Sequence, residues 1–270
     1  MLIELLLLLF NIIIDLEVNM KIAIVGYYGK VGKSVIKAVN EDSGCEIAFG
    51  VSRSAKENDT KDGIRVFKNF EAVDMKCEGI IDFSHRDNIE SMLDYAVKNN
   101  VPVVIGTTGL NEDDEKKVEE ASKNIPILLS HNTGFGINIM LGILKKMAKE
   151  LKEFDIEIIE KHHNRKEDAP SGTAKMLFDS MKEARPELYP QYGRDPVLQK
   201  RKKEEVGFHS VRGGNIISDH DVIFAGEDDV LTLSHQALTD ASFAKGALRG
   251  IKYLKNQKNG LFSMEDVIKG

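Results

Sequence analysis

The chain has little cysteine and no excess of positive charge. Cys45 and Cys77 are its only cysteines among 270 residues. They form neither a metal-ligand spacing nor a disulfide framework, so we expect a cytoplasmic protein without a metal site. The net charge of -6 argues against nucleic acid as a partner. A site for an anionic ligand therefore needs a local cluster of positive charge, and Lys161, Arg165 and Lys166 supply one.

The chain also lacks an apolar run long enough to cross a bilayer. Residues 5–9 and 12–14 are apolar, but this stretch is too short for a span, and Glu4 replaces the basic start of a secretory signal. The segment Leu16-Glu17-Val18-Asn19-Met20 could be encoded by a purine-rich ribosome-binding element before a start codon. We therefore expect residues 1–19 to be a non-native extension and no membrane contact; a membrane anchor is the alternative.

What is present is a globular composition, with 42 % hydrophobic and 30 % charged residues. Short β-branched runs alternate with helical patterns in the first half of the chain. The alternation predicts an α/β fold with a Rossmann-like parallel sheet. Ligands of such sheets lie beyond the carboxyl ends of the strands. Three turns are therefore expected at one crevice: Ser84, Gly106-Thr107-Thr108-Gly109, and Asn132-Thr133-Gly134-Phe135-Gly136.

A glycine-rich turn follows the first predicted strand, residues 21–25. The heptapeptide Gly26-Tyr27-Tyr28-Gly29-Lys30-Val31-Gly32 has the pattern GxxGxxG, whereas the dinucleotide fingerprint is GxGxxG. Such a turn lets the backbone approach a pyrophosphate at a free helix N-terminus. We favour a bound nicotinamide dinucleotide; a plain strand-to-helix turn is the alternative.

The end of the second predicted strand, residues 46–51, bears on which nucleotide binds. NAD sites usually place an acid there, whereas an arginine suits a 2′-phosphate. Ser52-Arg53-Ser54 stands at this point without an acid. The position favours NADPH, with a solvated Arg53 as the alternative, so we expect NADPH, NADH or both.

The pattern changes near residue 135. Glycine-containing turns separate three strand patterns at 206–212, 215–224 and 230–237, which predicts an antiparallel meander. We expect a second domain of α+β type with a mixed or antiparallel sheet. The expected limits are 20–134 with 241–270 for the dinucleotide-binding domain, and 135–240 for the substrate-binding and oligomerisation domain.

Two imidazoles, a lysine and an apparent helix start lie within a dozen residues. His162 and His163 can move a proton near neutral pH, and Lys166 adds a cation. Pro170-Ser171-Gly172-Thr173 predicts a helix start whose N–H groups can bind an anion. The segment predicts a site that holds a small carboxylate during proton transfer. A basic turn that only caps a helix is the alternative.

Several motifs together resemble those of the 4-hydroxy-tetrahydrodipicolinate (dihydrodipicolinate) reductase family, from Met20 to the C-terminus. They are the glycine turn, Asp82-Phe83-Ser84, Gly106-Thr107-Thr108-Gly109, the segment from Glu157 through His162-His163 to Ala174, and Gly260-Leu261-Phe262-Ser263-Met264-Glu265-Asp266-Val267. The string from the histidines to Pro-Ser-Gly-Thr is the most specific of them.

The resemblance implies an oxidoreductase of lysine and diaminopimelate biosynthesis that reduces a cyclic imine dicarboxylate with NADPH or NADH and forms a homotetramer through its second sheet. It makes His162 the proton donor and Lys166 its partner cation, with His163, Gly172 and Thr173 on the substrate carboxylates. Cofactor contacts are implied for Gly26, Gly29, Lys30, Val31, Gly32, Arg53, Ser84, Gly106, Thr107, Thr108, Asn132, Thr133 and Phe135.

This chain departs from the family pattern at two places. His85, followed by Arg86, stands where relatives have an arginine, and Asn132-Thr133-Gly134-Phe135 replaces a commoner Asn-Phe-Ser. Two other functions stay open: another NAD(P)-dependent Rossmann oxidoreductase acting on an amino or keto acid, and a non-catalytic NADP(H)-sensing protein. The remaining histidines have no spacing that forces a function, and we expect structural roles for His131, His209, His220 and His235.

Overall fold

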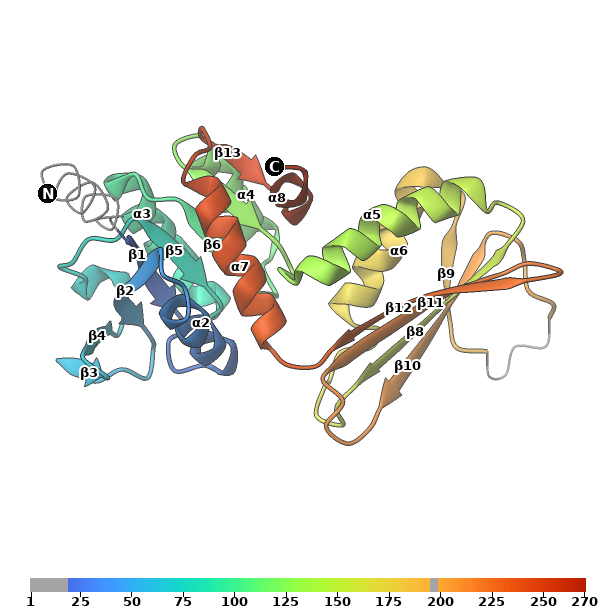
Figure 1. Cartoon of the computed structure of the whole chain (residues 1–270), viewed down its shortest axis with the longest axis horizontal. Helices are drawn as coiled ribbons and strands as arrows, with labels where there is room; N and C mark the ends of the chain where they lie inside the picture. Colours follow the sequence, from blue (N-terminus) through green and yellow to red (C-terminus); the bar gives the residue numbers. More distant parts are fainter. Residues whose placement is uncertain (1–18, 195–198) are drawn as a thin grey trace, which may run out of the picture. The chain divides into compact units, whose positions relative to one another are not determined.

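The computed structural model describes residues 19–194 and 199–270, so nearly all of the expected N-terminal extension lies outside the described residues. Figure 1 shows the chain, which divides into two compact units. The first comprises the described residues up to Ile127 with Leu254–Leu261, and the second comprises Leu128–Tyr253 with Phe262–Gly270. Helix α7 (Ala241–Leu254) falls in the second unit except for its last residue. The domain limits given above stay a prediction.

An eight-stranded sheet has the order β13-β7-β6-β5-β1-β2-β4-β3. Its strands are β1 (Met20–Val25), β2 (Cys45–Val51), β3 (Asp59–Lys61), β4 (Ile64–Phe67), β5 (Gly79–Asp82), β6 (Val103–Ile105), β7 (Pro126–Leu129) and β13 (Gly260–Phe262). Strand β1 pairs in parallel with both β2 and β5. The expected Rossmann-like parallel sheet is confirmed.

The sequence of β1 explains why this strand lies in the interior of the eight-stranded sheet. Residues 22–25 are apolar and fully buried, as a strand covered on both faces requires. The strands are connected by α2 (Lys30–Asn40), α3 (Ile89–Asn99) and α4 (Glu112–Ser122), and by the short turns η1 (Phe70–Ala72) and η2 (Arg86–Asn88). The β3–β4 hairpin was not expected; Asp62 and Gly63 have φ values of 54° and 82°, which its two-residue turn requires.

The second sheet has the order β12-β11-β8-β10-β9. Its strands are β8 (Asp155–His162), β9 (Tyr189–Tyr192), β10 (Glu205–Arg212), β11 (Ser218–Ala225) and β12 (Val230–Ala237). Strand β8 pairs in parallel with β10 and antiparallel with β11, so the expected mixed sheet is present. The expected antiparallel meander is confirmed for β11 and β12 but is wrong for β10, which lies beside β8 instead of β11. The reason lies in the turn after β10: the Gly213 N–H donates to the His162 carbonyl at 2.9 Å, and the turn thereby passes the end of β8.

Helices α5 (Phe135–Glu150) and α6 (Gly172–Ala184) cover one face of this sheet (Figure 1). Alternate residues of β8 point into the resulting core. Ile156 and Ile158 are apolar, whereas Glu160 and His162, next on the same face, are polar and buried. The apolar core thus ends in a buried polar cluster. Helix α8 (Met264–Lys269) completes the chain, and within the described ranges no helix is long and apolar enough to span a membrane.

Candidate active site

The glycine turn after β1 fits a dinucleotide. Gly26 has a φ of 83°, and a Cβ there would lie 2.2 Å from the Phe83 carbonyl oxygen, so only glycine fits. A Cβ on Gly32 would lie 2.1 Å from the Gly26 oxygen. Gly29 caps α2 without a side-chain hydrogen bond, and the first turn, which holds Lys30 and Val31, has no acid. This helix start therefore offers N–H groups and a positive dipole end to an anion, as a pyrophosphate needs.

The ends of β5 and β6 meet at the carboxyl edge of the same sheet. The Ser84 N–H donates to Thr107 Oγ1 at 2.8 Å, and Ser84 Oγ donates to Asp82 Oδ1 at 2.5 Å. Burial raises the pKa of the fully buried Asp82 to about 6. Gly106 is packed against the Phe83 ring, while Thr108 is exposed. The structure thus joins two predicted residues, Ser84 and Thr107, through a carboxyl group that sequence reasoning did not select.

The predicted Arg53 follows β2 and is engaged by an acid. Its Nη1 lies 2.8 Å from Asp87 Oδ2, and His85 Nδ1 lies 2.9 Å from the same oxygen. Arg86 pairs instead with Asp114, near the start of α4, at 3.0 Å. His85 and Arg86 stand where relatives have an arginine. His85 is the one of the two that shares an acidic partner, Asp87, with Arg53.

The second unit places His162 in a buried network of charges. His162 Nδ1 lies 2.6 Å from Glu160 Oε2, and Glu160 is fully buried. Arg212 donates to both oxygens of Glu160, at 2.7 and 2.8 Å. The Ser171 N–H donates to Glu160 Oε1 at 3.1 Å. The register of the β8–β10 pair explains why Arg212 reaches Glu160, because Arg212 is the Cα partner of His162.

The state of Glu160 decides what His162 can do. Burial opposes ionisation of Glu160, but the hydrogen bonds from His162 and Arg212 outweigh it and hold the pKa of this carboxyl well below its usual range. An ionised carboxylate only accepts hydrogen bonds, so Nδ1 of His162 must carry a proton. Nε2 is then the ring nitrogen that Glu160 does not engage, and its part in proton transfer stays a prediction.

His220, for which we expected only a structural role, packs against His162. It is fully buried, its Nε2 lies 3.0 Å from Ser171 Oγ, and its ring centroid lies 5.3 Å from that of His162 at an interplanar angle of 77°. Burial, with the charge of His162, lowers the pKa of His220 to about 3, so this ring is neutral near pH 7. The pairing of β11 with β8, which aligns His220 with Glu160, is the signal that the sequence lacked.

The start of α6 leaves two backbone amides for a ligand. Ser171 Oγ accepts from the Ala174 N–H at 3.1 Å, which leaves the N–H groups of Gly172 and Thr173 without a partner in the helix. A Cβ built on Gly172 meets nothing within 4 Å, so the space there is open. Thr173 Oγ1 accepts from Asn132 Nδ2 at 3.0 Å. The helix start is therefore open at Gly172, and the carboxylate-binding role of the two amides stays a prediction.

The expected cationic cluster is arranged differently. Lys166 Nζ pairs with Asp168 at 2.8 Å and keeps 23 % of its side chain exposed. Lys161 is on the other face of β8, paired with Asp221 at 2.8 Å. Arg165 donates to Asn215 at 3.1 Å. The cation closest to the polar cluster is instead Arg212, which sequence reasoning missed.

Three residues implied as cofactor contacts belong to the second unit. Asn132 Oδ1 accepts from the Gly134 N–H at 2.9 Å, before α5. Thr133 Oγ1 donates to the Phe243 carbonyl at 2.7 Å, and the Arg249 guanidinium lies 4.4 Å from the Phe135 ring centroid. These contacts order the entry to α5; the cofactor role of the three residues stays a prediction.

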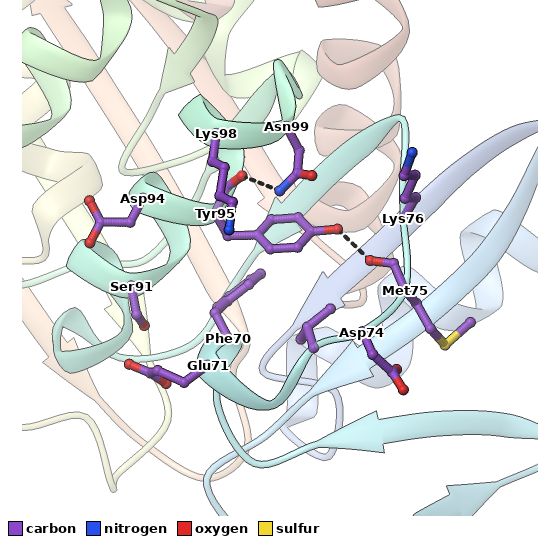
Figure 2. A pocket seen from close by; sticks show the side chains of 11 residues that line it. Phe70, Glu71, Asp74, Met75, Lys76, Ser91, Asp94, Tyr95, Lys98 and Asn99 are labelled. Carbon is purple, nitrogen blue, oxygen red and sulfur yellow. Dashed lines mark hydrogen bonds between the residues drawn. The ribbon is translucent and has the colours of Figure 1, made fainter.

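A separate hollow of about 410 Å³ lies between η1 and α3 (Figure 2). Tyr95 crosses it and donates to the Met75 carbonyl at 2.7 Å, and its lining includes no predicted site residue. Within the part of the chain that the structure describes, no group of three His, Cys, Asp or Glu side chains is placed to hold a metal.

Comparison with known proteins accounts for both units. Residues 20–133 match the family described as Dihydrodipicolinate reductase, N-terminus, and residues 136–268 match Dihydrodipicolinate reductase, C-terminus. The chain belongs to the dihydrodipicolinate reductase family. The 4-hydroxy-tetrahydrodipicolinate reductase of Caldanaerobacter subterraneus subsp. tengcongensis is 44 % identical over 92 % of this chain and 98 % of its own length. That of Clostridium novyi is 41 % identical with the same coverage.

Two solved structures have a similar fold. A dihydrodipicolinate reductase from Paenisporosarcina sp. TG-14, solved with bound dipicolinate, has a TM-score of 0.75 and 25 % identity over 91 % of this chain and 97 % of that one. An amine dehydrogenase from Mycobacterium smegmatis, at 10 % identity and a TM-score of 0.62, shares the fold. Membership of the dihydrodipicolinate reductase family makes this chain an oxidoreductase that uses a nicotinamide cofactor.

Proposed function

We propose that the chain reduces 4-hydroxy-tetrahydrodipicolinate to tetrahydrodipicolinate with NADPH, NADH or both, as a step of lysine and diaminopimelate biosynthesis. The observation that carries the proposal is the fully buried Glu160 carboxylate, which holds the His162 ring at 2.6 Å while Arg212 balances its charge. A proton donor held in this way suits a reaction in which negative charge develops on a bound ring.

The chemistry divides between the nucleotide and the protein. Elimination of water, which removes the hydroxyl group and a proton from the neighbouring carbon, converts the cyclic substrate into a conjugated imine. A nicotinamide nucleotide held at the glycine turn would supply the hydride that reduces this imine. His162 Nε2 then donates a proton to the ring, while Glu160 stabilises the proton that stays on Nδ1. Lys166, which Asp168 holds at 2.8 Å, places a positive charge beside the same segment.

The substrate carboxylates need donors rather than a proton source. The amides of Gly172 and Thr173 start a 13-residue helix, so they combine hydrogen-bond donors with the positive end of the helix dipole. His163 follows His162 on the extended chain, and its side chain therefore leaves the backbone on the opposite side. We assign proton transfer to His162 and carboxylate binding to His163, Gly172 and Thr173.

Replacement of His162 by alanine tests the proposal. We expect His162→Ala to lower turnover by about 10²–10⁴-fold, the usual contribution of a general acid, and to leave NADPH affinity unchanged in a calorimetric titration. His209→Ala is the matched control, because His209 is on β10 of the same sheet but pairs with Glu157 at 2.8 Å on the other face. Unchanged turnover in His162→Ala, or an equal loss in the control, would refute the assignment.

We further propose a cytoplasmic homotetramer formed through the second sheet. Strand β12 is an edge strand with exposed apolar side chains, Val230 at 60 % and Leu231 at 44 %, and Val211 on β10 is 44 % exposed. Edge strands of this kind pair readily with another chain. Light scattering should give four times the monomer mass; a monomer would contradict this assembly.

A further inference from the structure

Many NAD sites carry an acid directly after their second strand. In this chain Arg53 stands there, and an acid from another loop, Asp87, pairs with it. Arg53 follows β2, whereas Asp87 lies in η2, after β5. Strand β1 lies between β2 and β5 in the sheet, and all three run in parallel. The Arg53–Asp87 ion pair therefore spans the carboxyl end of β1, the strand that leads into the glycine turn.

The pair is placed where a ligand can reach it. Its atoms are 2.8 Å apart, and the side chains of Arg53 and Asp87 are 55 % and 60 % exposed. His85 Nδ1 accepts a hydrogen bond from the Asp87 N–H at 3.3 Å, which orders the backbone that carries this carboxylate. An arginine in this position suits a ribose 2′-phosphate, and a carboxylate suits free ribose hydroxyl groups. The chain presents both groups, already bound to each other.

We propose that Asp87 sets the preference between NADH and NADPH, because it competes with the 2′-phosphate for Arg53 and accepts hydrogen bonds from the ribose of NADH. The inference rests on the proposed function only in that a nicotinamide nucleotide binds the first unit. A phosphate on Arg53 would lie within a few ångströms of the Asp87 carboxylate. Two unit charges about 4 Å apart in water change a binding constant by roughly fivefold. Salt should weaken the effect, since both side chains are exposed.

Calorimetric titration of the full-length chain with NADPH and with NADH tests this inference. We expect Asp87→Asn to raise the affinity for NADPH relative to NADH by about fivefold or more at low ionic strength, and by less at high ionic strength. Asp74→Asn is the matched control, because Asp74 forms an exposed pair with Arg65 at 2.9 Å in the same unit and carries the same charge. The control should leave the ratio of the two affinities unchanged.

Three outcomes overturn the inference. An unchanged ratio in Asp87→Asn, while both nucleotides bind, removes the role of Asp87 and leaves the proposed function intact. An equal change of this ratio in Asp74→Asn would show that the effect comes from the net charge of the unit and not from Asp87. Binding of neither nucleotide to the unaltered chain would overturn the proposed function and this inference with it.

Discussion

Two fully buried carboxyl groups, one in each unit, have opposite titration behaviour. Asp82 ends β5 and Glu160 lies near the end of β8, and both have 0 % exposure. Burial raises the pKa of Asp82 to about 6, because its hydrogen bonds offset only part of the lost hydration. At Glu160, Arg212 and His162 overcome the same penalty and lower the pKa. The comparison shows that burial raises the pKa of an acid even when neutral groups donate hydrogen bonds to it, and that cationic donors from neighbouring residues reverse the direction of the shift.

Of the changes that separate the two carboxyl groups, removal of the charge of Glu160 should have the largest effect. Glu160→Gln keeps the shape but no longer requires a proton on His162 Nδ1, so we expect turnover to fall by about 10²-fold or more. NADPH affinity should stay unchanged, since the glycine turn is in the other unit. Glu157→Gln, on the opposite face of β8 and partly exposed, is the control. Equal activities of the two variants would show that Glu160 is only structural.

Replacement of Asp82 should change how stability depends on pH. The folded-state pKa is raised from 3.8 to about 6, so between these values the unfolded chain loses its proton first and stability falls as pH rises, by about 3 kcal/mol in total. Asp82→Asn should remove this fall. The contribution of Glu160 to stability depends on pH in the opposite direction. Because its pKa is lower in the folded chain than the unfolded value of 4.5, Glu160 stabilises the protein above pH 4.5, and this stabilisation is lost as pH falls.

Thermal unfolding at a series of pH values between about 4 and 6.5 measures the contribution of Asp82. We expect the Asp82→Asn curve to lie progressively above that of the unaltered chain as pH rises. Parallel curves for the two proteins would mean that Asp82 is already ionised in the folded state.

A smaller effect is expected at the glycine turn. A Cβ on Gly32 would lie 2.1 Å from the Gly26 oxygen, whereas one on Gly29 would lie 3.0 Å from it. Gly32→Ala should therefore weaken nucleotide binding by about tenfold, since the backbone must move, and Gly29→Ala should weaken it less. Titration with NADPH compares them. The reverse order would show that the turn does not position the nucleotide by its backbone.

The two units also differ in how far the sequence alone predicts them. The glycine turn is one continuous segment after a buried strand, so its position and its exposed helix start follow from local pattern. The cluster around His162 draws on β8, β10, β11 and α6. Arg212 could not be predicted, because its place depends on the turn at Gly213 passing the end of β8 instead of forming a hairpin. The position of His220 could not be predicted for the same reason, since only the register of β11 aligns it with Glu160.

The most direct test of the account is nucleotide oxidation by the unaltered chain with enzymatically generated 4-hydroxy-tetrahydrodipicolinate, run with NADPH and NADH in parallel and against a panel of amino and keto acids. We predict oxidation that depends on this dicarboxylate, with at least one of the two nucleotides, and little or none with the panel. No oxidation with either nucleotide, or faster oxidation with a panel compound, would contradict the proposed reaction.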